Sequence, residues 1–403
     1  MSEHPDFIPY GQHAIDEADI ASVVSVLRSS ALTNGPVVTE FESALTKLTG
    51  AEEAVVCSSG TAALHLAVAA LGVGPGDRVI VPALTFLASA NAARYAGADV
   101  IFADVNDCSG LMEPKHFEGA LKAAPPESVK AVIPVHLNGQ CCDMPGIAEI
   151  ARAHDVSIIE DACHALGGYY PSPADTSVVG SSAYSQATCF SFHPVKTVAM
   201  GEGGAVTTNH SDIAAAMRRL RNHGMERASA NLVMPEFALS PDGDRNPWYY
   251  EMTEIGWNYR ASDIHCALGL SQLTKLDSAV SRRAALVAQY DNALRSLSPA
   301  VRPIGRVGGR VAWHLYVVHI DFDAIGQSRA AVMNALEKAG IGTQVHYFPV
   351  HLQPYYQKLY GRQSLPGAEK YYGSCLTLPL FPEMVNTDVD RVVGELTHIV
   401  GMS

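Results

Sequence analysis

Short apolar runs alternate with stretches of helical periodicity between about residues 50 and 210. The runs expected to form strands are Ala54–Cys57, Arg78–Val81, Val100–Ala103, Ala131–Val135, Ser157–Glu160, Thr188–Ser191 and Gly204–Thr207. Helices are expected over Thr61–Leu71, Thr85–Ala96 and Met144–His154. Strands that are almost wholly apolar and are separated by helices are typical of a mainly parallel sheet covered on both faces. The pattern therefore predicts a large α/β domain.

The rest of the chain has a different pattern. A long helix is expected from about Ala261 to Gln289, with breaks allowed. Beyond it, the strands expected are Leu315–Ile320 and Gln344–Tyr347, and the helices are Arg329–Ala339 and Asp388–Val400. This mixture predicts a smaller α+β domain, which we place at residues 281–403, after an N-terminal segment and large domain at 1–280. Residues 225–250 are polar and rich in proline and glycine, which indicates a long functional loop or lid.

Composition narrows the class of ligand. The chain has 403 residues, 48% of them hydrophobic, which is enough for two domains. Its 28 basic and 41 acidic residues give a net charge of −13. The densest basic tract, Arg218–Arg221, lies in a helical pattern. An acidic chain without a basic stripe argues against nucleic acid as the main ligand, but a phosphorylated small molecule needs only a local pocket of backbone N–H groups.

The cysteines and the N-terminal residues point to the cytoplasm. None of the eight cysteines lies in a CxxC pair, so neither a zinc site nor a disulfide framework is predicted. Residues 1–12 lack the basic and apolar regions of a signal peptide, and no apolar run reaches the ~18 residues that span a membrane. We expect a soluble cytoplasmic protein with reduced thiols.

Two groups at expected strand ends suggest a phosphate and a carbonyl compound as ligands, because ligands of open α/β sheets bind there. Ser58–Thr61 lies between a strand and a helix, where hydroxyl groups, N–H groups and the helix dipole suit a phosphate; alone, it reads equally well as a helix cap. Lys196 is the only lysine in Cys189–Thr208, with Ser191 before it and glycines after it. A buried lysine has a lowered pKa and attacks aldehydes, whereas most lysines are simply solvated.

Asp161 and Phe86 complete a set that fits pyridoxal phosphate. Asp161 directly follows an expected strand, about 35 residues before Lys196, and can hold a protonated ring nitrogen or cap a turn. Phe86 can stack on a ring or belong to the core. The cofactor needs a phosphate cradle, a carboxylate at its pyridine nitrogen and a lysine for its aldehyde. All three occur here in order along the chain.

The chain resembles the DegT/StrS-type sugar aminotransferases, which have the aspartate-aminotransferase-like fold (fold type I). The segments that carry the resemblance are Cys57–Phe86, Ile158–Gly168, Cys189–Thr208 and Gly256–Leu273. The resemblance implies that Lys196 binds the cofactor covalently and later moves a proton, and that Asp161 pairs with the pyridine nitrogen. It implies further cofactor contacts by Gly60, Thr61 and Ser191 at the phosphate, Phe86 on the ring face, His164 near the ring hydroxyl, and Asn258 at the phosphate of a neighbouring subunit's cofactor. It also implies a homodimer with shared active sites. His164 departs from the glutamine of many members.

The resemblance implies transamination. Some relatives are dehydratases with histidine at the lysine position, but Lys196 is present here. L-glutamate would leave pyridoxamine phosphate, which would pass the amino group to a nucleotide-linked ketosugar. His193–Gly204, Asn246–Leu273 and His346–Tyr356 are similar to the family's members in pseudaminic acid biosynthesis. This similarity implies UDP-2-acetamido-2,6-dideoxy-β-L-arabino-hex-4-ulose as the substrate. Candidate sugar contacts, each equally readable as structural, are Thr33, Asn34, His223, Arg227, Tyr316 and His346.

Three other interpretations remain at this point. The first is an aminotransferase for another nucleotide-linked 4-ketosugar, such as one of the D-xylo series for a lipopolysaccharide or antibiotic. The second is a non-catalytic, cofactor-binding regulator, which the net charge of −13 disfavours because binding to nucleic acid needs a positive surface. The third is a structural α/β protein in which Lys196 is incidental.

Overall fold

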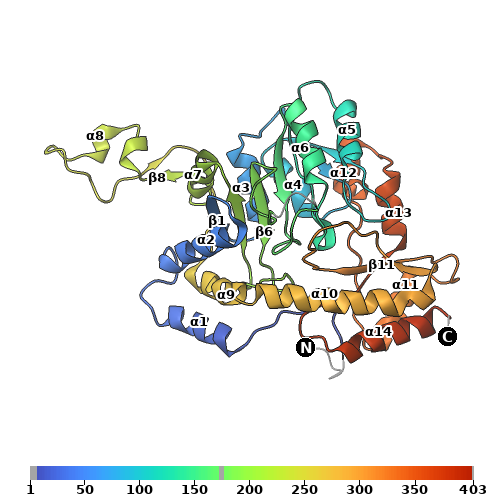
Figure 1. Ribbon diagram of the computed structural model, residues 1–403. Coiled ribbons are helices and arrows are strands. Elements are labelled where there is room, and N and C mark those ends of the chain that lie inside the picture. Colours follow the sequence, from blue (N-terminus) through green and yellow to red (C-terminus); the bar gives the residue numbers. More distant parts are fainter. Residues whose placement is uncertain (1–6, 172–176, 402–403) are drawn as a thin grey trace.

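A seven-stranded sheet forms the centre of the molecule (Figure 1). The computed structural model describes residues 7–171 and 177–401. The strands of the sheet are β1 (Glu53–Cys57), β2 (Arg78–Pro82), β3 (Asp99–Ala103), β4 (Val129–Val132), β5 (Ser157–Asp161), β6 (Ala187–Ser191) and β7 (Gly204–Thr208). They lie side by side in the order β1-β7-β6-β5-β4-β2-β3. Only β7 is antiparallel to its neighbours, so the predicted mainly parallel sheet is confirmed.

Helices cover the sheet and account for its apolar strands. Those near the sheet in sequence are α1 (Glu17–Leu27), α2 (Pro36–Thr49), α3 (Gly60–Ala70), α4 (Leu87–Tyr95), α5 (Pro114–Ala123), α6 (Met144–Ala153), α7 (Ser211–Leu220) and α9 (Asp263–Leu273), with the 3-10 turn η1 (Leu137–Gly139). Apolar side chains from α3 and from most of the strands share one continuous core. Because α3 is buried along almost its whole length, it shows little amphipathic pattern, as expected for a helix packed on all sides.

A second core lies beside the large sheet. Its sheet has three antiparallel strands, β10 (Val301–Pro303), β11 (Tyr316–Ile320) and β12 (Cys375–Leu378). The remaining helices are α10 (Leu276–Ala293), η3 (Leu294–Leu297), α11 (Arg329–Lys338), η4 (Val350–Leu352), α12 (Pro354–Tyr360), α13 (Pro366–Ser374) and α14 (Asn386–Ile399). Helix α10 runs across the lower part of Figure 1, above α1 and α14, and contributes to both cores. Ile8 also joins the second core, through backbone bonds with Gly340 and Gly342. The boundary after residue 280 stays a prediction, since α10 runs across it.

Three expectations need correction or refinement. The long helix expected over residues 261–289 consists of α9 and α10, which are separated at Thr274 and Lys275. The strand expected over Ala131–Val135 ends at Val132, and Val135 makes only an isolated bridge. No strand forms over 344–347 in the described structure: Gln344 makes a single bridge, and the segment lines a pocket instead. Its alternating pattern therefore reflects a pocket wall, not a sheet.

The loop expected over residues 225–250 is largely irregular and contains short elements. They are β8 (Met225–Glu226), η2 (Ser229–Asn231), α8 (Pro235–Ala238) and β9 (Glu251–Met252). Strands β8 and β9 pair as an antiparallel hairpin, which projects away from the body at the left of Figure 1. Across the whole described chain, no helix combines the length and apolar character needed to cross a bilayer.

Candidate active site

A pocket of about 590 Å³ opens at the carboxyl ends of β1, β5 and β6. It brings together eight of the predicted site residues, which come from segments far apart in sequence: Gly60, Thr61, Phe86, Asp161, His164, Ser191, Lys196 and His346. Residues not singled out from sequence also line it, among them Tyr10, His193, Glu202, His314 and Tyr347. The strand ends thus converge as the parallel topology requires.

The predicted phosphate cradle lies at the start of α3. The Ser59 hydroxyl accepts a hydrogen bond from the Ala62 N–H at 3.1 Å, so Ser59 is a true N-cap. Gly60 is the first helical residue, and a Cβ there would come within 2.8 Å of the Ser191 Cβ. The first turn of a helix has N–H groups without intrahelical partners. Glycine therefore lets the helix N-terminus approach the end of β6 closely enough for Ser191 to join the same anion-binding surface.

Lys196 is half-buried in the pocket wall, so it is not an ordinary solvated lysine. Its backbone N–H donates to the His193 carbonyl at 2.8 Å. Its Nζ lies 3.4 Å from Nε2 of His314. Burial lowers the pKa of Lys196 to about 8, although the charges of Cys163 and Asp161 act in the opposite direction. A substantial neutral fraction near neutral pH makes this amine nucleophilic toward a carbonyl carbon.

Asp161 ends β5 with unused hydrogen-bonding capacity. Its Oδ2 accepts from the Ser89 hydroxyl at 2.6 Å, and its Oδ1 accepts from the Cys163 N–H at 3.2 Å. Thr85 lies 2.7 Å behind Ser89 and holds that hydroxyl in place. A carboxylate has about four acceptor positions on its two oxygens, so part of this capacity remains available in the pocket. Asp161 can therefore hold a cationic N–H of a ligand.

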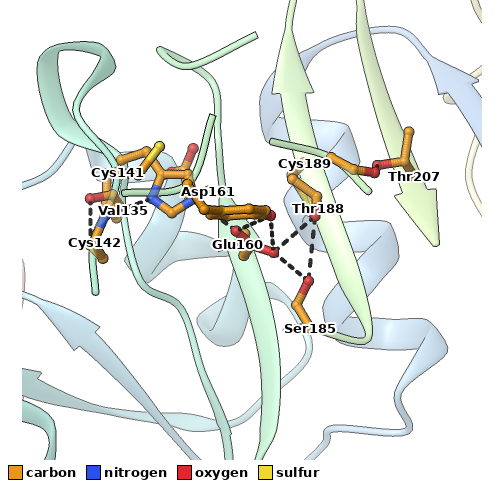
Figure 2. Close-up of polar contacts among 12 residues, drawn as sticks. Val135, Cys141, Cys142, Glu160, Asp161, Ser185, Thr188, Cys189 and Thr207 are labelled. Carbon is orange, nitrogen blue, oxygen red and sulfur yellow. Dashed lines mark hydrogen bonds and ion pairs between the residues drawn. The ribbon is translucent and has the colours of Figure 1, made fainter. Parts of the chain in front are cut away.

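Glu160, the preceding residue, closes a separate network beneath the pocket (Figure 2). Its side chain is fully buried and accepts from His136 Nε2 at 2.8 Å and from the Tyr170 hydroxyl at 2.9 and 3.0 Å. Figure 2 shows Ser185 and Thr188 pointing toward the same carboxylate, at 2.5 and 3.1 Å. Burial works against the charge of His136, but hydrogen bonds with Cys142 and Glu160 outweigh it and raise its pKa to about 10. The Cys142 N–H donates to Nδ1 of His136, so its Nε2 carries the proton that Glu160 accepts, and this buried network fixes β5 directly behind Asp161.

Two neutral histidines lie beside the lysine. The Asn138 N–H donates to Nδ1 of His164 at 3.2 Å, so the neutral ring carries its proton on Nε2, where the Tyr347 oxygen lies 3.3 Å away. Burial, together with the charge of Lys196, lowers the pKa of His164 and of His314 well below the usual value. The two rings are 4.4 Å apart. His164 therefore offers an N–H donor to an oxygen in the pocket.

No sequence motif marks His314 or Tyr347 as a site residue. Both come from the region of the second core, more than 100 residues beyond Lys196, and neither belongs to a motif with a chemical signature. For Tyr347, the only sequence signal is the strand expected over residues 344–347, which predicts a sheet and not a pocket wall. Ser89 was also missed, because a serine within an expected helix reads as ordinary.

Besides Tyr316, five predicted residues lie outside this pocket: Thr33, Asn34, His223, Arg227 and Asn258. All are exposed. Asn258 pairs with Asn222 in an isolated bridge, and Arg227 stacks on Tyr250 in the projecting hairpin.

The prediction that Tyr316 contacts the sugar is wrong. It was a candidate sugar contact, but it lies fully buried in the second core, stacked on Tyr290 at 4.4 Å between ring centroids. Its hydroxyl donates to Asp291 at 2.8 Å. An aromatic residue in an apolar strand pattern is satisfied by such packing, so Tyr316 has no surface left for a ligand.

Several known proteins are similar to this chain in sequence or in structure. The DegT/DnrJ/EryC1/StrS aminotransferase family matches residues 13–397. The spore coat polysaccharide biosynthesis protein SpsC of Bacillus subtilis (strain 168) is 39% identical over 397 residues, which cover 98% of this chain and 97% of SpsC. Helicobacter pylori PseC, an aminotransferase involved in the biosynthesis of pseudoaminic acid, superposes with a TM-score of 0.87 at 27% identity, covering 98% of this chain and all of PseC.

A further solved structure concerns the cofactor. The PLP-form of Spr1654 from Streptococcus pneumoniae superposes with a TM-score of 0.85 at 28% identity, covering 98% of this chain and 99% of that protein. A PMP-form is also known. The pocket fits this group: Gly60 leaves room for a phosphate, Asp161 keeps capacity for a ring nitrogen, and Lys196 is half-buried. The protein is therefore a pyridoxal-phosphate-dependent enzyme of fold type I, and not a regulator or a purely structural protein. The chain belongs to the DegT/DnrJ/EryC1/StrS aminotransferase family.

Proposed function

We propose that this enzyme transfers an amino group from L-glutamate to the C4 keto group of a nucleotide-linked 6-deoxy sugar. The observation that carries the proposal is that a half-buried Lys196 and Asp161 line the same pocket. The bound cofactor supplies an electron sink for the carbon that gains or loses a proton. The protein supplies the groups that hold this cofactor and the base that moves the proton.

Lys196 would act as that base. Its pKa of about 8 lets the amine take a proton from the donor carbon and return one to the sugar carbon near neutral pH. His314, 3.4 Å from Nζ, is neutral and can orient the amine between these positions. Asp161 would keep the ring nitrogen protonated, and the Ser89 hydroxyl would hold its carboxylate in position.

The remaining pocket residues would bind and orient the cofactor. Gly60, Thr61 and Ser191 would hold the phosphate at the N-terminus of α3, and Phe86 would cover a ring face. His164 would donate its Nε2 proton to the ring oxygen, as glutamine would through its amide. This explains how the chain can carry histidine there.

Two substrates of this class are supported by different relatives. The likeness to PseC supports UDP-2-acetamido-2,6-dideoxy-β-L-arabino-hex-4-ulose and pseudaminic acid biosynthesis. The higher identity to SpsC, whose name refers to spore coat polysaccharide, supports another nucleotide-linked 4-ketosugar, such as one of the D-xylo series. We favour the first, because the segments around Tyr249 and Tyr250 resemble the pseudaminic acid enzymes. His346 is the one candidate sugar contact that lines the pocket.

We also propose a homodimer in which each site is completed by the second chain. Several large apolar side chains of the projecting hairpin region are exposed, including Trp248 at 72% and Ile255 at 80%. A second copy would cover such a surface. It would also bring Asn258 to the phosphate of the neighbouring cofactor, and Thr33, Asn34, His223 and Arg227 toward the neighbouring sugar.

A half-reaction tests the function and the substrate together. The enzyme is first converted to its pyridoxamine form with L-glutamate, and excess donor is removed. UDP-linked 4-ketosugars of the L-arabino and D-xylo series are then added separately, and the absorption of the lysine-bound cofactor is followed. Return of this absorption with the L-arabino sugar alone supports the favoured substrate, whereas return with the D-xylo sugar alone supports the alternative. If L-glutamate produces no pyridoxamine form, the proposal fails.

A further inference from the structure

A second cavity, of about 270 Å³, lies between the segment that carries Lys196 and helices α9 and α10. Its walls include Gln12, His13, Gln272, Lys275 and Arg283. Lys196 lines this cavity as well as the active-site pocket. The two cavities therefore adjoin the same lysine, but the second one contains neither Asp161 nor the phosphate cradle.

Arg283 is the unusual group in this wall. It projects from α10 toward the core and is only 1% exposed. Its Nε and Nη1 atoms are buried and make no hydrogen bond within residues 7–171 and 177–401. None of the ion pairs between described residues includes it. Burial lowers its pKa to about 10, so the guanidinium is still charged at neutral pH.

The other cations of the wall already have partners. Lys275 lies 2.6 Å from the Asp16 carboxylate and 2.8 Å from that of Asp19. Arg282 donates to the Asn386 side chain at 3.0 Å and to the Met384 carbonyl. Arg283 is thus the cation of this wall whose buried N–H groups have no hydrogen-bond partner among the described residues. An uncompensated buried charge is strongly destabilising, so a folded protein normally pairs it.

We propose that this cavity is an anion-binding site in which Arg283 binds a small carboxylate. A guanidinium is planar and presents N–H donors in the geometry that a carboxylate accepts. The two unpartnered atoms, Nε and Nη1, are N–H donors that carboxylate oxygens can accept from, and the negative charge of the carboxylate would offset the charge of the guanidinium. Gln12 and His13 provide further polar atoms in the wall. The inference goes beyond the transamination proposal and does not depend on it.

A bound carboxylate would also act on the neighbouring lysine. Because Lys196 lines the cavity, a negative charge there would favour the protonated amine and raise its pKa above about 8. Small carboxylates would therefore tune the protonation of the residue that attacks the cofactor.

Thermal unfolding of the cofactor-loaded enzyme tests the site. Acetate, L-glutamate, phosphate and chloride are compared at constant ionic strength. We expect a saturable rise in the melting temperature of about 3 °C with acetate, reached near 100 times its dissociation constant, and none with chloride. Arg283→Met should lose the response, and Arg295→Met, which removes one charge from an exposed site, should keep it. A response to L-glutamate but not to acetate would place the effect in the amino-donor site and would overturn the proposal.

Three further outcomes would also overturn the proposal: no acetate response in the wild type, an equal response in Arg283→Met, or a response to phosphate alone. If Arg283→Met does not fold, Arg283→Lys keeps the charge but loses the planar fork, and it should bind acetate about tenfold more weakly by calorimetry. A second readout is the pH midpoint for the reaction of Lys196 with pyridoxal phosphate in enzyme freed of cofactor. Acetate should raise this midpoint in the wild type and leave it unchanged in Arg283→Met. Neither measurement requires a sugar substrate, so failure of the site and failure of the proposed reaction are distinguishable.

Discussion

Glu160 and Asp161 are adjacent buried carboxylates at the end of β5, yet their surroundings differ completely. Glu160 has donors on both oxygens from four side chains, one of them the imidazole of His136, and has no exposed surface (Figure 2). Asp161 faces the pocket with one side-chain donor and one backbone donor. The hydrogen-bonding capacity of the Glu160 carboxylate is used within the protein, whereas the Asp161 carboxylate keeps acceptor positions free for a ligand.

This difference distinguishes a structural carboxylate from a functional one without the use of a sequence motif. Successive residues of a strand point to opposite faces, so one residue can be enclosed while the next opens into a pocket. The same criterion distinguishes His136, whose Nε2 proton is already accepted by Glu160, from His164, which is neutral and offers an N–H group to the pocket. Unsatisfied hydrogen-bonding capacity, and not burial alone, marks the site.

The largest expected effect is on activity, in Asp161→Asn. The amide cannot hold a protonated ring nitrogen, so we expect the amino-transfer rate to fall by about 1000-fold, which corresponds to about 4 kcal/mol. The melting temperature should change little, because Ser89 can still donate to the amide oxygen. Steady-state kinetics measures the amino-transfer rate, and thermal unfolding measures the melting temperature. A variant with full activity, or one that unfolds, would contradict the contrast with Glu160.

Glu160→Gln should show the opposite behaviour. It removes the charged acceptor that the His136 imidazole and three buried hydroxyl groups share, so we expect a loss of about 3 kcal/mol in the free energy of unfolding. Chemical denaturation measures this loss. The fraction that remains folded should still form the lysine–cofactor bond. A Glu160 variant that is stable but inactive would move Glu160 into the catalytic machinery.

The neutral fraction of Lys196 should set how fast cofactor-free enzyme reacts with pyridoxal phosphate. Because only the neutral amine reacts, the rate should rise about tenfold per pH unit below a midpoint near 8 and level off above it. An ordinary lysine would have its midpoint near 10.5. Stopped-flow absorption provides the measurement, and Lys196→Ala is the control that should show no such reaction. A midpoint near 10.5 would show that the amine is fully hydrated.

Tyr316→Phe tests a group that the structure assigns to packing. It removes one hydroxyl donor to Asp291, and Arg306 still pairs with that carboxylate at 2.5 Å. We expect a loss of about 1 kcal/mol in stability and an unchanged KM for the sugar nucleotide. A raised KM with unchanged stability would return Tyr316 to the substrate site.

The smallest effect is expected for His164→Gln. The glutamine amide can donate to the same oxygen as the imidazole Nε2, so the dissociation constant for pyridoxal phosphate should change less than about threefold, well under one lost hydrogen bond. His164→Ala should weaken binding by about tenfold, since the donor is absent. Equilibrium titration of cofactor-free enzyme measures both. Equal losses in the two variants would show that the ring itself is required.

The sequence by itself determined the sheet and the order of its chemical groups. The features that predicted it are local in sequence: the apolar strands, the glycine at the start of α3, the acid at the end of β5 and the lysine after β6. Parallel topology then brings such strand ends to one edge of the sheet. For this reason Gly60, Asp161, Ser191 and Lys196 could be predicted to meet.

Only the tertiary structure decided which buried polar groups are satisfied. His314 and Tyr347 reach the pocket from more than 100 residues away, Glu160 is closed by side chains that no spacing connects, and Tyr316 is enclosed by Tyr290. The isolation of Arg283 is likewise visible only once the partners of Lys275 and Arg282 are known. Hydrogen bonding and charge pairing depend on contacts across the whole fold, whereas strand and helix patterns depend on near neighbours in sequence.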